Sequence, residues 1–437
     1  LGNETNLYRG LALARKANAQ SESGKIAEGR ATSDRAQKIF EALRKVPGLE
    51  DEAAYGLAFT AFANQNVGVA RMDKAEVEDA VKLLRPIVAA GRATRSMKLT
   101  QADLLQYLAH AQQDAAEGIK LCEESRTLLA GMGALDLSDL TAASIYGDVS
   151  DSQSRMAQRL GQTDEAERLT RIVEQMAAKV LERRPGDLRA MLNSYLATNT
   201  LGGAAQDRHE LAKADDYFAR SIEAARGYTL FNPADSGGWS NLVNAGRTRA
   251  VNLVELGRVV DAERLLRETA ELEHDPRNKA GVDGSIYFTW RLVEAVAAQR
   301  GDLPAARAAL AEIKRVAPLV IRDRNFNADL TAITNLMVEV FAHDIAAVGG
   351  DYATIHDRSL DLDVRLRKLE PKDAVSLQFR DDAIRRNAGW LAESALRTGR
   401  YEEAAAIARQ VIDKPIVGRL GQAAVNDLGL VGRVIEV

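Results

Sequence analysis

Residues 290–318 read WRLVEAVAAQRGDLPAARAALAEIKRVAP, and this stretch decides the class of fold. Its first apolar residues recur with the period of an α-helix, at Trp290, Val293, Val296 and Ala297. Gly301 follows, where a helix C-cap needs a residue that adopts the left-handed conformation. Asp302 is then a candidate N-cap for a second helix. The stretch therefore predicts two amphipathic helices joined by a tight turn.

The second helix has its own apolar stripe and its own boundaries. Pro304 lies in the first turn, where a missing N–H costs little. Ala306, Leu310 and Ile313 form the stripe that we expect to be buried. Pro318 is expected to end the helix, because proline removes a hydrogen-bond donor and disfavours helix in the residue before it.

The same local pattern, a small residue followed four positions later by a larger one, recurs along the whole chain. We take the residue equivalent to Ala306 as the marker of each copy: Ala36, Ala80, Gly118, Ala166, Ala214, Ala262, Ala306, Ile355 and Ala404. Successive markers lie 44, 38, 48, 48, 48, 44, 49 and 49 residues apart. A spacing that stays close to 48 residues over most of the chain is the signature of a repeat architecture.

The spacing within residues 290–318 resembles the tetratricopeptide repeat (TPR) at five positions: Trp290, Gly301, Ala306, Leu310 and Pro318. Glu294 departs from the pattern, since the family has glycine or alanine there. The resemblance implies an all-α fold, a right-handed α-solenoid of about nine TPR-like helix-turn-helix repeats. Because a basic TPR unit has about 34 residues, these repeats are a long variant. We expect the surplus in long first helices at 327–348 and 372–398 and in long loops at 227–239 and 274–285.

The domain organisation follows from the repeats. Residues 1–417 are predicted to form the TPR-like array, and residues 418–437 a C-terminal capping segment. The interruption at 21–25 is predicted to be the turn of the first hairpin. The chain begins with Leu1, from which we expect a signal peptide, a membrane anchor or an effector domain upstream.

Composition and charge exclude several classes of partner. A net charge of −4 provides no basic surface for nucleic acid. We find no run of about 18 apolar residues, which predicts that this chain does not span a membrane. The single cysteine, Cys122, excludes an intrachain disulfide and a zinc site built from several cysteines.

Sequence motifs for catalysis are absent. The chain has no P-loop, GxGxxG, HExxH, GxSxG or EF-hand pattern. Its five histidines are scattered over different repeats, and we assign His343 a structural role in helix packing. Cys122 is expected to be a buried, inert thiol. We therefore predict no catalytic residue, no metal site and no cofactor, and a protein that is not an enzyme.

The candidate binding residues come from the TPR resemblance, which implies that the first helices line a concave groove. Asparagine and arginine can hold a peptide backbone or a carboxylate by fixed hydrogen bonds. Polar residues of this kind on the expected first helices are Asn193, Asn241, Asn244, Arg247, Arg291, Asn335, Arg385 and Asn387. Tyr228 and Phe231, from the expected loop at 227–239, complete the set. The alternatives are ordinary solvated helix residues and aromatics that seal the gap between repeats.

The functional hypothesis is a protein- or peptide-binding scaffold or sensor module within a larger bacterial regulatory protein. An alternative is an autoinhibitory or ligand-sensing array that controls an N-terminal effector, such as a kinase, TIR, caspase-like or winged-helix domain. A third alternative is an enzyme with its site in the concavity. The expected partner is a protein or peptide, or the linked effector domain. The expected location is the cytoplasm, or the periplasm if a membrane anchor precedes residue 1.

Overall fold

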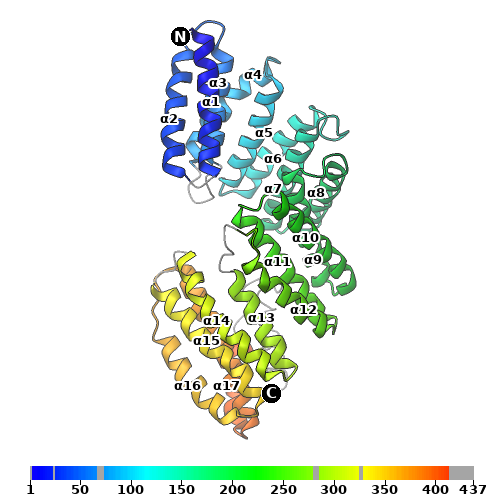
Figure 1. Cartoon of the computed structure of the whole chain (residues 1–437), viewed down its shortest axis with the longest axis vertical. Helices are drawn as coiled ribbons and strands as arrows, with labels where there is room; N and C mark the ends of the chain where they lie inside the picture. The colour runs from blue at the N-terminus through cyan, green and yellow to red at the C-terminus, as the bar shows by residue number, and fades with distance from the viewer. Residues whose placement is uncertain (1, 23–24, 66–72, 279–284, 324–327, 413–437) are drawn as a thin grey trace. The chain divides into compact units, whose positions relative to one another are not determined.

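The computed structural model describes residues 2–22, 25–65, 73–278, 285–323 and 328–412. Every regular element in these ranges is helical (Figure 1). The α-helices of residues 1–197 are α1 (Asn3–Glu22), α2 (Ile26–Leu43), α3 (Glu50–Gln65), α4 (Lys74–Ala89), α5 (Arg95–His110), α6 (Ala115–Ala130), α7 (Leu140–Arg159), α8 (Thr163–Arg183) and the start of α9 (Leu188–Asp207).

Residues 198–437 form a second compact unit. After the end of α9, its described helices are α10 (Leu211–Phe231), α11 (Ser236–Glu255), α12 (Val259–Ala270), the 3-10 helix η2 (Glu271–His274), α13 (Ser285–Gln299), α14 (Leu303–Asp323), α15 (Ala328–Val348), α16 (Tyr352–Arg367), α17 (Ala374–Arg397) and α18 (Tyr401–Ile412). Consecutive helices pack against each other from α1 to α8 and from α10 to α18. Helix α9 packs on α10 through Ala205 and Phe218. The described α-helices thus pair as nine hairpins, and we call the odd-numbered members first helices and the even-numbered members second helices.

The repeat markers confirm the period predicted from the sequence. Each of the nine lies in a different second helix, from Ala36 in α2 to Ala404 in α18. All nine are buried, and most have no exposed surface at all. A small side chain at this position lets the second helix approach its neighbours closely, which explains why alanine or glycine recurs there.

The turn between the two helices also follows the prediction in the best-preserved repeat. Gly301 adopts a φ of 73°. The Asp302 backbone N–H donates to the Ala297 carbonyl at 2.9 Å, which is the hydrogen bond of a Schellman motif. The Asp302 carboxylate then accepts from the Ala305 N–H at 3.1 Å and caps α14. Glycines 161, 257, 350 and 399 take the same left-handed conformation in four other hairpins.

His209 occupies this turn position in the α9–α10 hairpin, with a φ of 59°. A side chain with a Cβ is strained in this conformation by about 1 kcal/mol, and the exposed His209 ring offers no packing in return. We expect His209→Gly to raise the free energy of unfolding by about 0.5–1 kcal/mol, as measured by urea denaturation. Gly257→Ala, at the same turn position of the α11–α12 hairpin, is the control and should lower it. Destabilisation by His209→Gly would contradict the strain.

Pro318 does not end the helix as the sequence predicted, because α14 continues to Asp323 with Pro318 inside it. Pro86 lies inside α4 in the same way. In both cases the proline and the residue four positions earlier, Lys314 or Lys82, lie on the exposed face. Water can therefore satisfy the carbonyl that loses its helical N–H partner, which lowers the cost of the proline.

The prediction of a long loop at 227–239 is wrong. Helix α10 extends to Phe231 and α11 begins at Ser236, so only four residues connect them. The Trp239 indole N–H donates to the Pro233 carbonyl at 2.9 Å, and Trp239 is buried. The Tyr228 hydroxyl donates to the Asp235 carboxylate at 2.7 Å. Tyr228 and Trp239 therefore seal the junction, which is the alternative that the sequence left open for this stretch.

Other predicted boundaries hold or lie outside the described ranges. The long first helices are confirmed as α15 and α17, with 21 and 24 residues. Helix α1 ends at Glu22 and α2 begins at Ile26, and residues 23–24 of the turn predicted at 21–25 lie outside the described residues. Residues 279–284 of the second expected loop, and the capping segment 418–437, lie outside the described residues.

Of the described helices, α15 is long and apolar enough to cross a membrane by length and composition, with a mean hydropathy of 1.2. The core helix of a globular domain gives the same signal. Helix α15 is packed between α13, α14, α16 and α17, and its Ile333, Val340 and Phe341 are buried in the interior of the second unit. We attribute its apolar composition to this packing.

Candidate functional site

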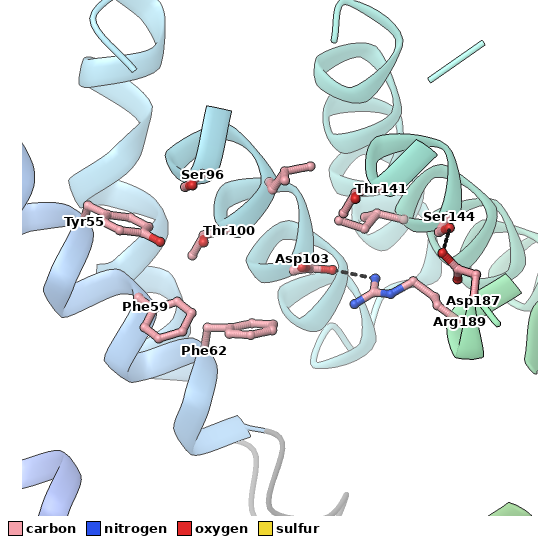
Figure 2. A pocket seen from close by; sticks show the side chains of 12 residues that line it. Tyr55, Phe59, Phe62, Ser96, Thr100, Asp103, Thr141, Ser144, Asp187 and Arg189 are labelled. Atoms are coloured by element: carbon pink, nitrogen blue, oxygen red, sulfur yellow. Dashed lines mark hydrogen bonds and ion pairs between the residues drawn. The ribbon is translucent and has the colours of Figure 1, made fainter. Parts of the chain in front are cut away.

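Four of the first helices of residues 1–197 line an open hollow of about 270 Å³, which we call the first-helix pocket (Figure 2). Four successive repeats contribute to it through α3, α5, α7 and the beginning of α9. Its lining residues are Tyr55, Phe59, Phe62, Ser96, Leu99, Thr100, Asp103, Thr141, Ser144, Ile145, Asp187 and Arg189. Each of them lies on a first helix except Asp187, which directly precedes α9. No second helix contributes to this lining.

One wall of the pocket is a row of aromatic side chains on α3. Tyr55, Phe59 and Phe62 follow each other at helical spacing, with 6.0 Å between successive ring centroids. Phe62 also lies 6.0 Å from the Tyr107 ring of α5. All four rings are half-buried, so each presents part of its surface to solvent. Figure 2 shows the three α3 rings facing the α5 residues of the pocket.

The starts of the helices that form the pocket are fixed by capping groups. The Thr94 hydroxyl accepts from the Met97 N–H at the start of α5, and Asp139 accepts from two N–H groups at the start of α7. The Arg95 guanidinium donates to both oxygens of Asp139, which ties α5 to α7. Asp187 accepts from the Ala190 N–H of α9 at 2.9 Å and from the Ser144 hydroxyl of α7 at 3.1 Å. These contacts hold successive first helices in register.

Opposite the aromatic row, Arg189 of α9 bridges two carboxylates. Its Nη1 atom lies 2.9 Å from Asp103 of α5 and 2.7 Å from Asp148 of α7. Both carboxylates are largely buried, whereas a third of the Arg189 side chain remains exposed, 34%. One guanidinium therefore links three successive repeats at the edge of the pocket.

Two carboxylates of α7, those of Asp148 and Asp151, have pKa values above their ordinary range. The pKa of Asp148 is raised to about 7, mainly by burial, and the nearby Asp103 and Asp151 carboxylates act in the same direction. Arg189 and a hydrogen bond from Asn193 act in the opposite direction without cancelling the effect. Burial also raises the pKa of Asp151 above its ordinary value, although Arg155 pairs with it at 2.8 Å. Around Arg189, three carboxylates (Asp103, Asp148 and Asp151) therefore share two guanidinium groups, those of Arg189 and Arg155.

Among the residues predicted from the sequence, Asn193 is the one that lies next to the first-helix pocket. Its side-chain amide donates to the Ser144 carbonyl at 3.2 Å and is buried, so it supports the pocket wall from behind. Gly147 faces the same amide, and a Cβ at this position would lie 2.7 Å from the Asn193 nitrogen. Asn193 thus positions α9 against α7.

The other predicted residues belong to the second unit, and several are engaged within it. The Asn387 amide donates to the Ser359 carbonyl at 2.7 Å in the interior. The Arg247 guanidinium donates to Asn244 at 2.7 Å and lies over the Phe288 ring. The Arg385 guanidinium donates to Asp382 at 3.0 Å. The remaining members are Asn241, which is half-buried, Asn335, which is exposed, Tyr228, which pairs with Asp235, and Phe231, which is 60% exposed.

Arg291 takes part in a buried ionic cluster. Its guanidinium lies 2.7 Å from Glu294 on the same helix and 3.1 Å from Asp344 on α15. The Cζ atom of Arg291 also lies over the Phe341 ring, 4.2 Å from the ring centroid. Glu294, the residue that departs from the TPR pattern, has no exposed side-chain surface and is held here by Arg291. The cluster joins α13 to α15 and explains why a charged residue is tolerated inside the repeat.

Cys122 and His343 are packing residues. Cys122 is fully buried, and burial raises the pKa of its thiol to about 12. His343 is also buried, with the Ser359 hydroxyl 3.3 Å from its Nε2 atom. In the part of the chain that the structure describes, no three His, Cys, Asp or Glu residues are grouped to hold a metal ion.

The pocket was not predicted from the sequence. Phe59 and Phe62 recur at helical spacing, and helical spacing alone does not distinguish a buried ring from a half-exposed one. Asp103 and Arg189 are 86 residues apart, so nothing local indicates that they pair. The usable signal was the run of three aromatics on one face of α3, in the sequence YGLAFTAF.

No protein-family model matches the sequence, and no curated protein matches it. Among solved structures, the apo form of RapI is 9% identical and aligns over 90% of this chain and 98% of its own, with a TM-score of 0.52. The apo form of the quorum sensor NprR from B. thuringiensis is 13% identical over 94% of this chain and 88% of its own, with a TM-score of 0.45. A Rap protein complexed with Competence and Sporulation Factor is 12% identical over 98% and 99%, with a TM-score of 0.44.

At these identities a structural match shows the fold alone, and the RapI match extends over nearly the whole of both chains. The repeat period, the nine hairpins and this match agree with one another. The chain is an all-α helical repeat protein of the TPR-like type.

Proposed function

We propose that this chain binds a peptide or an extended protein segment in the first-helix pocket and acts as a scaffold or sensor. One observation carries the proposal. The lining residues of the pocket lie on the first helices of four successive repeats, apart from Asp187, which directly precedes α9. An extended segment can therefore contact several repeats at once. Half-exposed aromatic rings are suited to holding apolar side chains, and the Arg189 bridge fixes polar groups beside them.

The chemistry of the pocket favours binding over catalysis. Its lining contains no histidine or cysteine. The Ser144 hydroxyl donates to Asp187, but that carboxylate is engaged with the Ala190 N–H and with Arg184. A serine nucleophile needs a general base that can accept its proton, and a carboxylate held by these donors is a poor one.

The proposal is tested with peptides selected on the full chain from a random display library. We expect Phe59→Ala to weaken binding of the selected peptides by about tenfold or more, because it removes the central ring of the aromatic row. Isothermal titration calorimetry measures the change. Tyr8→Ala is the matched control, since Tyr8 is a highly exposed aromatic on α1 outside the pocket, and it should change nothing.

Phe231→Ala tests the surface predicted from the sequence. If this variant weakens binding and Phe59→Ala does not, the ligand contacts α10 and the pocket is the wrong site. Failure of the library to yield any peptide that binds the full chain would also contradict the proposal.

Two finer proposals accompany this one. The first is that the array belongs to a larger bacterial regulatory protein and controls a linked N-terminal effector, a role to which the extended surface of a repeat array is suited. The sequence upstream of Leu1 tests it, and an upstream segment without an effector domain would contradict it. The second is a cytoplasmic location, which cell fractionation tests directly.

A further inference from the structure

The charges around the first-helix pocket do not balance. Three charged groups line it, Asp103, Asp187 and Arg189. Four more lie next to these through ion pairs or charge interactions: Asp148, Asp151, Arg155 and Arg184. Together they are four carboxylates and three guanidinium groups. Arg155 and Arg184 each serve one carboxylate, Asp151 and Asp187. Arg189 is left to serve both Asp103 and Asp148. The site is therefore one positive charge short of neutrality when all four carboxylates are ionised.

We propose that the first-helix pocket selects a ligand with a cationic group, an ammonium or a guanidinium, next to an aromatic or apolar group. This inference rests on the proposed function and names the chemical class of the ligand. The cationic group supplies the missing charge beside Asp103, the carboxylate of the Arg189 bridge that lines the pocket. The apolar group packs on the rings of α3.

The aromatic row supports the same class of ligand. Tyr55, Phe59 and Phe62 present partly exposed rings, and a cation near a ring face is attracted by its quadrupole. Hydroxyl oxygens of Ser96, Thr100 and Thr141 line the pocket on α5 and α7 and can accept hydrogen bonds from an ammonium or guanidinium. An anionic ligand would meet carboxylates, and the one guanidinium in the lining already serves two of them.

The ionisation of Asp148 provides a second readout. The groups that face it are Asp103 from α5, Asp151 on its own helix, and Arg189 and Asn193 from α9. With a pKa of about 7, Asp148 is partly protonated near neutral pH. A bound cation favours the carboxylate and lowers this pKa, so binding releases a proton. Affinity should then rise by up to about tenfold between pH 6 and pH 8.

The test uses short synthetic peptides of the form Phe-X-Phe, amidated at the C-terminus, with calorimetry on the full chain. X is lysine, norleucine or glutamate in N-acetylated peptides, and a norleucine peptide with a free N-terminus separates an α-amino group from a side-chain cation. We expect the lysine peptide to bind about tenfold more tightly than its acetylated norleucine counterpart, and the glutamate peptide to bind most weakly. Phe59→Ala should weaken all of them.

Two conservative variants connect the preference to the carboxylates. Asp103→Asn should bring the lysine and norleucine affinities close together, because it removes the surplus negative charge. Asp148→Asn should flatten the dependence on pH between 6 and 8. Thermal denaturation checks that each variant folds, and Asp361→Asn on α16 of the second unit is a control that should change neither property.

The outcomes separate the two proposals. Equal affinities for lysine and norleucine, both sensitive to Phe59→Ala, would overturn the cationic preference and leave the pocket as the binding site. Tightest binding of the glutamate peptide, or a selected library peptide without any cationic group that binds in the pocket, would overturn it as well. If neither the synthetic peptides nor the library yields binding that depends on Phe59, the proposed function itself fails.

Discussion

Replacement of Arg291 by leucine is expected to lower the free energy of unfolding of the second unit by about 3–5 kcal/mol. The Arg291 guanidinium pairs with Glu294 and Asp344, and Glu294 is fully buried. Without the guanidinium, the protein must keep a carboxylate away from water beside the apolar surface of Phe341. Urea denaturation followed by tryptophan fluorescence measures the effect, since Trp239, Trp290 and Trp390 all lie in the second unit.

Two variants serve as controls for the Arg291 prediction. Arg385→Leu makes the same chemical change on α17, where the partner Asp382 is about half exposed, and should cost less than about 1 kcal/mol. Replacing all three members of the cluster by apolar residues should recover much of the stability, because no charge remains buried. Equal effects of Arg291→Leu and Arg385→Leu would contradict the account.

Phe40→Ala is expected to destabilise the first unit by a similar amount, about 3–5 kcal/mol. The Phe40 ring, on second helix α2, is fully buried and fills the space above Gly56 of α3 and Gly10 of α1. Three helices of the first unit therefore meet at one side chain. Circular dichroism follows this loss, whereas tryptophan fluorescence does not, because the first unit contains no tryptophan.

The contact between the Phe40 ring and Gly56 can also be tested by changing the glycine. Gly56→Ala should cost about 1–3 kcal/mol, since its new Cβ would collide with Phe40. Adding Phe40→Leu should recover part of that loss, so the two changes should not be additive. Tyr8→Ala, on the exposed face of α1, should stay within about 0.5 kcal/mol. Additive effects of the two changes would show that ring and glycine do not interact.

The fold could be predicted because its determinants are local and repeated. Eight of the nine described second helices carry a buried alanine or glycine at the marker position, and α16 carries the buried Ile355. Five hairpins carry a left-handed glycine at the turn. These features are visible in the sequence as a period. The prediction was wrong where local propensity was the only guide, as at Pro318, which the exposed face of α14 tolerates, and at Tyr228–Phe231, which packing draws into α10.

The candidate site could not be predicted in the same way. Asp103, Asp148 and Arg189 come from three repeats, and their contact depends on how successive first helices stack. The candidate asparagine and arginine residues were chosen by residue type. The type does not show whether a side chain already bonds to other groups of the protein. Asn193 and Asn387 bond to backbone carbonyls in the interior, and Arg291 is held between two carboxylates. The proposed site depends on residues that differ among the repeats, and a period in the sequence reports only what the repeats share.

The most direct test of the account is a hydrogen–deuterium exchange footprint of the full chain, with and without a saturating library-selected peptide. The first-helix pocket predicts slower exchange concentrated in α3, α5, α7 and the beginning of α9, and no such change in the Phe59→Ala variant. Protection confined to second helices, or to helices α10–α18, would contradict a binding site on the first helices of residues 1–197.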